Sequence, residues 1–283
     1  MNSEPNMSVG STNGGTDSAT ELLRGQFRRT NNVPSFEVLG VRVHAVEMEE
    51  AIKHLHALIG DRKSHARFVA VTAMHGVAAA RRDSAFRRVL NSADLVVADG
   101  TPLVWVARIK GHRFRRRVSG CDLVDNFCRD TRGAYRHFFY GGTPGAAERL
   151  ANRLRDRFGI LVAGTYTPPF RPLTDAEESE LISIVEKASP DVLWVGLSSP
   201  KQETWMYQHR LKLKVPLMLG VGAAFDLNSG NVQRAPVWMR DHGLEWLFRL
   251  AAEPRRLWKR YLVTIPHTLW FVGLELMGFS KVR

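Results

Sequence analysis

The segment Asp94-Leu-Val-Val-Ala-Asp-Gly100 decides the fold that the sequence predicts. Its four central residues are all apolar, which is typical of a strand that is covered on both faces of its sheet. A carboxylate and a glycine follow the strand, and Pro102 then begins a segment with helical periodicity. A buried strand, a short turn and a helix form the repeating unit of α/β proteins with parallel sheets.

The same alternation continues through most of the chain. We predict strands over residues 38–43, 68–72, 95–98, 137–140, 160–164, 192–197 and 217–221, and helices over residues 48–59, 75–90, 102–110, 121–131, 144–158, 175–188 and 201–211. The sequence therefore predicts an α/β fold with a Rossmann-like, mostly parallel sheet and helices on both faces. A C-terminal basic amphipathic helical appendage is expected to follow it.

The composition suggests three parts. Residues 1–33 are rich in Ser, Asn, Gly and Thr, which predicts a disordered tail. Residues 34–233 are predicted to form an α/β catalytic domain, and residues 234–283 a helical appendage that associates with a membrane. We expect no signal peptide and no membrane-spanning helix, since the apolar stretch 261–279 carries Pro266, His267 and Glu275. Cys121 and Cys128 lack a redox or metal spacing and are expected to be buried, which fits a reducing cytoplasm.

Charge limits the kinds of partner that the chain can bind. Its 40 Lys and Arg residues outnumber 28 Asp and Glu residues, for a formal net charge of +12. A surplus of arginine indicates an anionic partner, namely nucleic acid, an anionic membrane surface or a phosphorylated substrate. Helix-turn-helix and RNA-binding signatures are absent, so we expect no nucleic acid. The helix faces around Val77, Phe86 and Val89 suit either a core or an interface, which leaves a homo-oligomer open.

Several residues that follow the predicted strands suit a substrate site, because ligands of parallel sheets bind at the carboxyl ends of the strands. Asp99 is placed to act as a general base, with Gly100 leaving room for substrate; the alternative is that Asp99 caps the next helix. Gly141 and Gly142 begin a loop that could present backbone N–H groups to a phosphate, or could make only a tight turn.

Two more strand ends carry candidate binding residues. Lys201 suits a phosphate and Gln202 a sugar hydroxyl or a uracil edge, although both could be solvated residues of a first helical turn. In Gly220-Val-Gly-Ala-Ala-Phe-Asp226, Gly222 allows a ligand close to the backbone and Asp226 supplies a carboxylate. The alternative for this segment is a close contact between helix and strand with a capping aspartate.

The C-terminal region is rich in arginine. Arg249 ends one helical segment, and Pro254 can begin another in which Arg256 and Arg260, four residues apart, share a face. Aromatic residues interleave with these charges. The pattern predicts a segment that lies on anionic lipid, or alternatively a solvated charged face.

No metal and no other cofactor is predicted. The sequence contains no Asp-x-Asp motif and no Cys/His ligand spacing. Any positive charge at an anion site is therefore expected to come from guanidinium groups.

Taken together, these segments resemble the WecG/TagA/CpsF family of bacterial glycosyltransferases. The resemblance runs from Val38 to roughly Pro266. Six motifs carry it: Asp94-Leu-Val-Val-Ala-Asp-Gly100, Arg117-Val-Ser-Gly-Cys-Asp-Leu123, Pro200-Lys-Gln-Glu203, Gly220-Val-Gly-Ala-Ala-Phe-Asp226, Arg234-Ala-Pro-Val-Trp-Met239 and Glu253-Pro-Arg-Arg-Leu-Trp-Lys-Arg260.

The resemblance implies an inverting, metal-independent enzyme of cell-surface polysaccharide biosynthesis. Such an enzyme moves a sugar, often N-acetylmannosamine or its uronic acid, from a UDP-sugar donor to a polyprenyl-diphosphate-linked saccharide. It would work in the cytoplasm as a peripheral protein on the inner face of the plasma membrane. The donor sugar, the acceptor and the linkage are not defined by the sequence.

The resemblance also implies roles for particular residues. Asp99 matches the family's proposed base, Thr72 a threonine near the acceptor, and Arg117 an arginine that stabilises the leaving diphosphate. Asp122, in the same motif as Arg117, is assigned to substrate binding, and the C-terminal arginines are expected to complete the site. His75 stands near the position where family members commonly carry asparagine, so it is a candidate acceptor contact.

Two other functions are compatible with the sequence. The first is a nucleotide-sugar-modifying enzyme on a Rossmann-like sheet, although no dinucleotide fingerprint follows the first strand. The second is a non-catalytic protein that binds a membrane surface.

Overall fold

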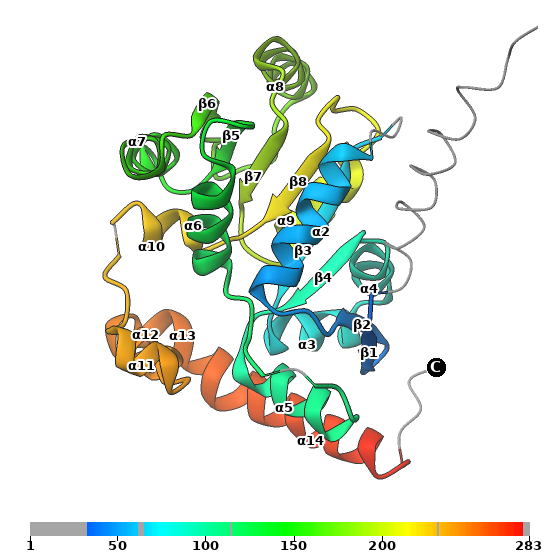
Figure 1. Ribbon diagram of the computed structural model, residues 1–283. Helices are drawn as coiled ribbons and strands as arrows, with labels where there is room; N and C mark the ends of the chain where they lie inside the picture. Colours follow the sequence, from blue (N-terminus) through cyan, green and yellow to red (C-terminus); the bar gives the residue numbers. More distant parts are fainter. Residues whose placement is uncertain (1–32, 62–64, 114, 231, 280–283) are drawn as a thin grey trace, which may run out of the picture. The chain divides into compact units, whose positions relative to one another are not determined.

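An eight-stranded sheet lies at the centre of the fold, which is described by a computed structural model for residues 33–61, 65–113, 115–230 and 232–279 (Figure 1). The strand order is β1-β2-β4-β3-β8-β7-β5-β6. The strands are β1 (Ser35–Val38), β2 (Val41–His44), β3 (Arg67–Thr72), β4 (Leu95–Ala98), β5 (Arg136–Gly141), β6 (Leu161–Tyr166), β7 (Val192–Gly196) and β8 (Leu217–Gly220). All neighbouring strands are parallel except β1, which pairs antiparallel with β2. The predicted α/β fold with a mostly parallel sheet is confirmed.

The single strand predicted over residues 38–43 is wrong, because these residues form a hairpin turn and parts of two strands. Leu39 and Gly40 both have positive φ angles, of 50° and 79°, and reverse the chain between β1 and β2. Leu39 is nevertheless fully buried, and the carboxylate of Glu275 accepts a hydrogen bond of 2.6 Å from its backbone N–H. Because this turn residue is apolar and buried, the hydrophobic run in the sequence is unbroken. No polar residue marks the reversal of the chain between the two strands.

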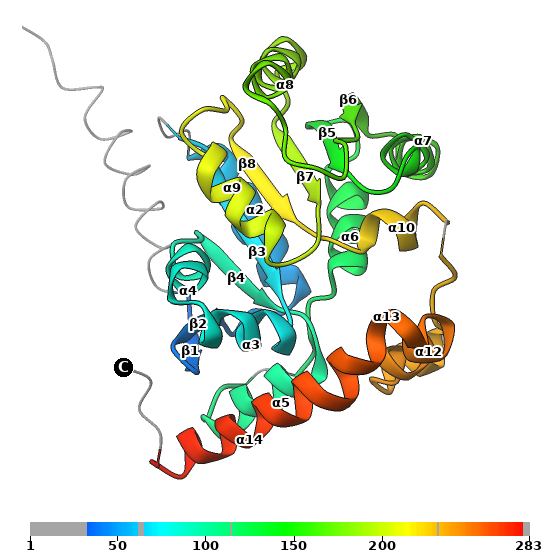
Figure 2. The same cartoon turned by 180° about the vertical axis from the view of Figure 1, so that it is seen from behind.

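Helices cover both faces of the sheet, as predicted (Figure 2). On one face, four helices contact one another: α2 (Met48–Gly60), α6 (Gly120–Thr131), α7 (Ala146–Phe158) and α10 (Ala224–Asn228). On the other face, α4 (Ser84–Asn91) contacts both α3 (Met74–Arg82) and α9 (Lys201–His209). The helix α8 (Asp175–Ala188) packs on β6, and α5 (Thr101–Ile109) follows β4. Cys121 and Cys128 are buried on α6, as expected.

The single helix predicted over residues 75–90 is also wrong, because Asp83 divides it into α3 and α4. The Asp83 carboxylate accepts hydrogen bonds from the backbone N–H groups of Ala85, at 2.8 Å, and Phe86, at 3.1 Å, and so caps α4. Val77 and Phe86 are buried in the core and Val89 packs against it, so this apolar face belongs to the core. The other predicted helices agree with the structure to within two residues at each end.

The C-terminal region adds α11 (Val237–Asp241) and α12 (Glu245–Ala252), then a continuous helix made of α13 (Pro254–Trp258), the π-helical segment η2 (Lys259–Thr264) and α14 (Ile265–Leu276). We call this continuous helix the terminal helix. It packs against α3, where the Arg81 guanidinium lies 3.3 Å from the centre of the Phe271 ring. At its far end, the Glu275 carboxylate binds the Lys110 ammonium at 2.7 Å.

The predicted C-terminal helical appendage is present, and its basic and apolar residues are separated along its length. The positive residues of the terminal helix lie at its start, and its exposed residues from η2 onward include Leu262, Val263 and Trp270. Within the described residues, no helix is both long enough and apolar enough to cross a membrane. Residues 1–32 of the predicted disordered tail lie outside the described residues, and the boundary at residue 233 stays a prediction.

Candidate active site

Two adjacent strand ends form the floor of the candidate site. Thr72 ends β3 and Asp99 follows β4, and the Asp99 backbone N–H donates a 2.8 Å hydrogen bond to the Thr72 carbonyl. The Thr72 hydroxyl is buried and has no hydrogen-bond partner among the described residues. The hydrogen bond between Asp99 and Thr72 holds the Asp99 backbone beside the end of β3. The Thr72 hydroxyl takes no part in it and can bond a ligand.

Asp99 is held in a charged environment. Its side chain is 31% exposed, and the Arg117 guanidinium lies 3.1 Å from its carboxylate. Burial raises the pKa of Asp99 above its ordinary value and Glu245 adds to this, while Arg117, Arg249 and the backbone N–H of Gly120 oppose it. A carboxylate with a raised pKa and an accessible face is suited to take a proton.

The alternative role of Asp99, as the cap of the next helix, is not supported. The N-cap residue of α5 is Gly100, and no side chain caps this helix. Gly100 has a φ angle of 128°, a conformation that favours glycine. Gly100 therefore turns the chain directly after Asp99 and leaves the carboxylate for other partners.

A chain of ion pairs connects Asp99 to the C-terminal region. Arg117 bonds both Asp99 and Glu245, at the start of α12. Arg234 lies between Glu245, at 3.8 Å, and Asp122, at 2.6 Å. These contacts tie β4, α6 and α12 together, so the C-terminal region helps to position Asp99. Burial lowers the pKa of Arg117, but Asp99, Glu245 and Asp122 raise it well above its ordinary value, so this side chain stays charged.

A second group of arginines, Arg249 and Arg260, lies near His75, and Arg249 also acts on Asp99. Among the described residues, no Asp or Glu lies within ion-pair distance of Arg249 or Arg260, and the Arg249 Nε is buried without a hydrogen bond. Burial lowers the pKa of Arg260, with Arg249 and Arg256 adding to this and Tyr261 opposing it. Mutually repelling guanidiniums without acidic partners favour the binding of an anion.

His75 lies at the start of α3, within electrostatic reach of these arginines. Burial, and then Arg260 and Arg249, lower its pKa to about 3. The imidazole is therefore neutral at physiological pH and offers one donor and one acceptor nitrogen. Arg256, by contrast, is paired with Glu253 at 2.6 Å and is exposed.

The glycines at the end of β5 are explained by packing. A Cβ atom on Gly141 would lie 2.7 Å from the carbonyl oxygen of Gly196, and one on Gly142 would lie 3.1 Å from the Phe225 ring. Packing is therefore a sufficient reason for both glycines, and neither the phosphate contact nor the tight turn expected of this loop is needed to explain them. The nearby Thr143 hydroxyl donates a 3.0 Å hydrogen bond to Asp226, which joins the loop after β5 to α10.

Among the candidate residues near the ends of β5, β7 and β8, Gln202 is the most buried polar side chain. It is buried, its amide nitrogen donates to Glu203 at 3.1 Å, and its amide oxygen has no partner among the described residues. A Cβ atom on Gly222 would lie 3.4 Å from that oxygen. Lys201 is exposed and makes no ion pair with any described residue.

The structure thus divides the predicted residues into two groups along one edge of the sheet. The first group surrounds the ends of β3 and β4 and comprises Thr72, His75, Asp99, Gly100, Arg117, Asp122, Arg249 and Arg260. The second follows β5, β7 and β8 and comprises Gly141, Gly142, Lys201, Gln202, Gly222 and Asp226. Arg256 contacts Glu253 and lies beside the first group.

Three charged residues of the site were not predicted. They are Glu245, Arg234 and Arg240, which lies 3.5 Å from Asp122. Their sequence signals are that Arg234 begins one of the six motifs and that single carboxylates alternate with arginines after residue 233. Among the described residues, no three His, Cys, Asp or Glu side chains are grouped as metal ligands.

The fold is α/β, and the candidate site gathers charged and polar side chains at the carboxyl ends of parallel strands, next to helices of the C-terminal region. Residues 36–281 match the model of the glycosyl transferase WecG/TagA/CpsF family. The chain belongs to this family and is a glycosyltransferase, which sets aside the two alternative functions.

Similar proteins have a more specific name. An N-acetylglucosaminyldiphosphoundecaprenol N-acetyl-beta-D-mannosaminyltransferase of Bacillus spizizenii is 30% identical over 218 residues, covering 76% of this chain and 82% of that protein. A protein of the same name from Staphylococcus aureus is 24% identical over 254 residues, covering 89% of this chain and 98% of that protein.

The chain of ion pairs predicts a cost for losing its central carboxylate. In Glu245→Ala, Arg117 and Arg234 lose a buried partner, and we expect the free energy of unfolding to fall by about 3 kcal/mol. Urea denaturation measures this change. Glu253→Ala removes a carboxylate whose partner is exposed, and this control should change stability by only about 0.5 kcal/mol. Equal stability of the two variants would contradict a structural role for Glu245.

Proposed function

We propose that this glycosyltransferase moves an N-acetylmannosaminyl group, or a related hexosyl group, from a UDP-sugar to a polyprenyl-diphosphate-linked saccharide. The names of the relatives from Bacillus and Staphylococcus support both substrates. The product would enter the synthesis of a cell-surface polymer. The enzyme would work at the cytoplasmic face of the plasma membrane, where lipid-linked acceptors are presented.

In the proposed mechanism, the acceptor hydroxyl attacks the anomeric carbon of the donor with inversion. Asp99 takes the hydroxyl proton as the new C–O bond forms, and the bond between the anomeric carbon and the UDP oxygen breaks. The raised pKa of Asp99 suits this role, because an effective base has a pKa close to the working pH. Neutral His75 and the unpartnered hydroxyl of Thr72 are available to orient the acceptor.

The leaving UDP carries the charge that develops in the reaction. Arg249 lies close to Asp99 and His75, and Arg260 lies close to His75 and Arg249. Neither arginine has an acidic partner in the described chain, so we assign the diphosphate to them. Fixed cations that face a developing negative charge stabilise the transition state. This unpaired positive charge beside a carboxylate with a raised pKa is the observation that carries the proposal.

A donor screen tests the proposed function directly. UDP release is measured for a panel of UDP-sugars with an undecaprenyl-diphosphate-linked N-acetylglucosamine acceptor. We expect the highest rate with UDP-N-acetylmannosamine and no release above hydrolysis without acceptor. A panel in which no UDP-sugar supports transfer would refute the proposed substrates.

Asp99→Asn should lower kcat on the order of 100- to 10,000-fold, which is the contribution of a positioned base. The substitution keeps the shape of the side chain, so the melting temperature should stay near that of the unchanged protein. Asp156→Asn, on the exposed face of α7, is the matched control and should keep full activity. Full activity of the Asp99 variant would reject Asp99 as the base.

The pH profile should report the same carboxyl group. Asp99 must be deprotonated to act as a base, so kcat/KM should fall as pH decreases through its pKa. Because burial raises that pKa, the acid limb should lie above the ordinary aspartate value of about 4. The residual activity of Asp99→Asn should lack this limb, and a limb that persists there would assign the titration to another group.

Arg260→Gln should weaken UDP binding by about tenfold, the effect of losing one charge-assisted hydrogen bond. Titration calorimetry with UDP measures the affinity. Arg255→Gln, on the same helix but exposed, is the control and should bind UDP as the unchanged protein does. If both variants bind UDP equally well, Arg260 does not contact the diphosphate.

A further inference from the structure

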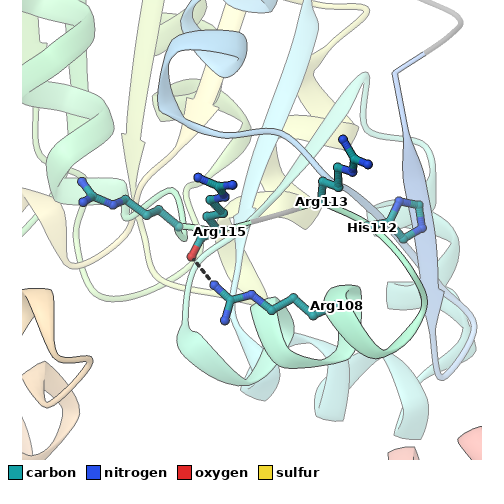
Figure 3. A pocket seen from close by; sticks show the side chains of 5 residues that line it. Arg108, His112, Arg113 and Arg115 are labelled. Carbon is teal, nitrogen blue, oxygen red and sulfur yellow. Dashed lines mark hydrogen bonds between the residues drawn. The ribbon is translucent and has the colours of Figure 1, made fainter.

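A second cluster of positive charge lies outside the candidate active site. A hollow of about 620 Å³ opens in the loop after α5 (Figure 3). We call it the basic hollow, and its lining consists of Arg108, His112, Arg113, Arg115 and Arg116. No acidic residue lines it.

Two hydrogen bonds hold the backbone at Arg115, one of the residues that line the hollow. The Glu47 carboxylate accepts a 2.7 Å hydrogen bond from the Arg115 backbone N–H, and Arg108 donates a 2.9 Å hydrogen bond to the Arg115 carbonyl. Across the described chain, no carboxylate forms an ion pair with the side chain of Arg113, Arg115 or Arg116. A held loop with several unneutralised guanidiniums fits an anionic ligand that carries phosphate.

Exposed apolar side chains adjoin the basic hollow on α5. Trp105 is 53% exposed and Ile109 is 67% exposed, and their spacing of four residues puts them on one face of the helix. Arg108 lies between them in sequence and lines the hollow. Tryptophan beside basic residues is typical of protein surfaces that contact the lipid headgroup region.

The terminal helix ends close to this surface. Lys110, directly after α5, binds Glu275 of α14. Both views put α5 and α14 at the same end of the fold, and α14 exposes Trp270, which is 66% accessible (Figures 1 and 2). The Lys110–Glu275 ion pair therefore ties the end of α5, next to the basic hollow, to the end of the terminal helix.

We propose that the basic hollow binds the phosphate headgroup of an anionic phospholipid while Trp105 and Ile109 enter the headgroup region. This adds a second membrane contact to the one expected of the terminal helix. It goes beyond the proposed sugar transfer and does not depend on which sugar is moved. Charge complementarity selects an anionic lipid surface as the occupant, and the adjoining apolar pair favours it over a free phosphate.

The consequence for the enzyme follows from the sequence of the loop. Arg116 precedes Arg117, which bonds Asp99. A headgroup held in the basic hollow would therefore contact residues that directly precede Arg117, the arginine of the candidate site, in the sequence. The bound lipid would orient this edge of the sheet toward a membrane that presents the acceptor diphosphate.

Vesicle sedimentation of the full chain tests the proposal. The vesicles consist of phosphatidylcholine alone, or of phosphatidylcholine with one-third phosphatidylglycerol. Arg113→Gln/Arg115→Gln should lose roughly 25-fold in affinity for the anionic vesicles, at roughly fivefold for each charge. The matched control Arg153→Gln/Arg155→Gln removes the same charge from α7, at the other end of the fold in Figure 1, and should lose less than about twofold.

A second variant tests the apolar half of the surface. Trp105→Ala/Ile109→Ala leaves the net charge unchanged and alters only exposed side chains. We expect weaker binding to the anionic vesicles, together with a stronger dependence on salt. Unchanged binding by this variant would overturn the insertion of α5.

Three results would overturn the basic hollow as a lipid site. Equal losses in the two arginine pairs would mean that only net charge matters. Full binding by Arg113→Gln/Arg115→Gln would mean that the terminal helix suffices. The third result concerns inorganic phosphate. If phosphate raises the melting temperature of the unchanged protein but not that of Arg113→Gln/Arg115→Gln, and the two bind vesicles equally, the hollow binds a soluble anion.

Sugar transfer to a short-chain, water-soluble acceptor should be unchanged in Arg113→Gln/Arg115→Gln. Failure of the lipid site is therefore distinguishable from failure of the proposed function.

Discussion

The bond between Asp99 and Arg117 is the contact on which the candidate site depends. Asp99 is fixed by the end of β4, and Arg117 reaches from it to Glu245 in the C-terminal region. Because a partly buried carboxylate is costly without a partner, the strand end and the C-terminal helices stabilise one another. The α/β part alone would present Asp99 with Arg117 but without Glu245 and Arg249. The enzyme therefore consists of a common fold and a C-terminal region that supplies the missing charges.

Much of this organisation could be predicted from sequence, because the strands are apolar throughout and the strand ends carry polar residues. The apolar run in Asp94-Leu-Val-Val-Ala-Asp-Gly100 was enough to predict β4 and the position of Asp99. The errors have local causes. Leu39 is buried at a turn, so no polar residue marked the hairpin, and Asp83 accepts hydrogen bonds from two backbone N–H groups that periodicity does not reveal. The pairing of Arg117 with Glu245 joins residues 128 positions apart, and no local pattern encodes it.

Three groups of arginines in this protein differ in their chemistry. Arg117 and Arg234 are paired with carboxylates and hold the candidate site together. Arg249 and Arg260 have no such partner among the described residues, and we propose that they bind an anionic ligand. The basic hollow is separate from both, in a loop held through its backbone. The net charge of +12 therefore includes arginines that stabilise the fold and arginines that are available to a ligand. The number of charges alone does not distinguish these two roles.

The clasp between Glu275, Lys110 and the Leu39 turn has a consequence for the order of folding. Its hydrogen bond from Leu39 to Glu275 joins residues 236 positions apart. Closing so long a loop costs conformational entropy, which the contacts formed in between must offset. The clasp therefore closes after the sheet has brought its two ends together, and the terminal helix docks late on a fold that is already assembled.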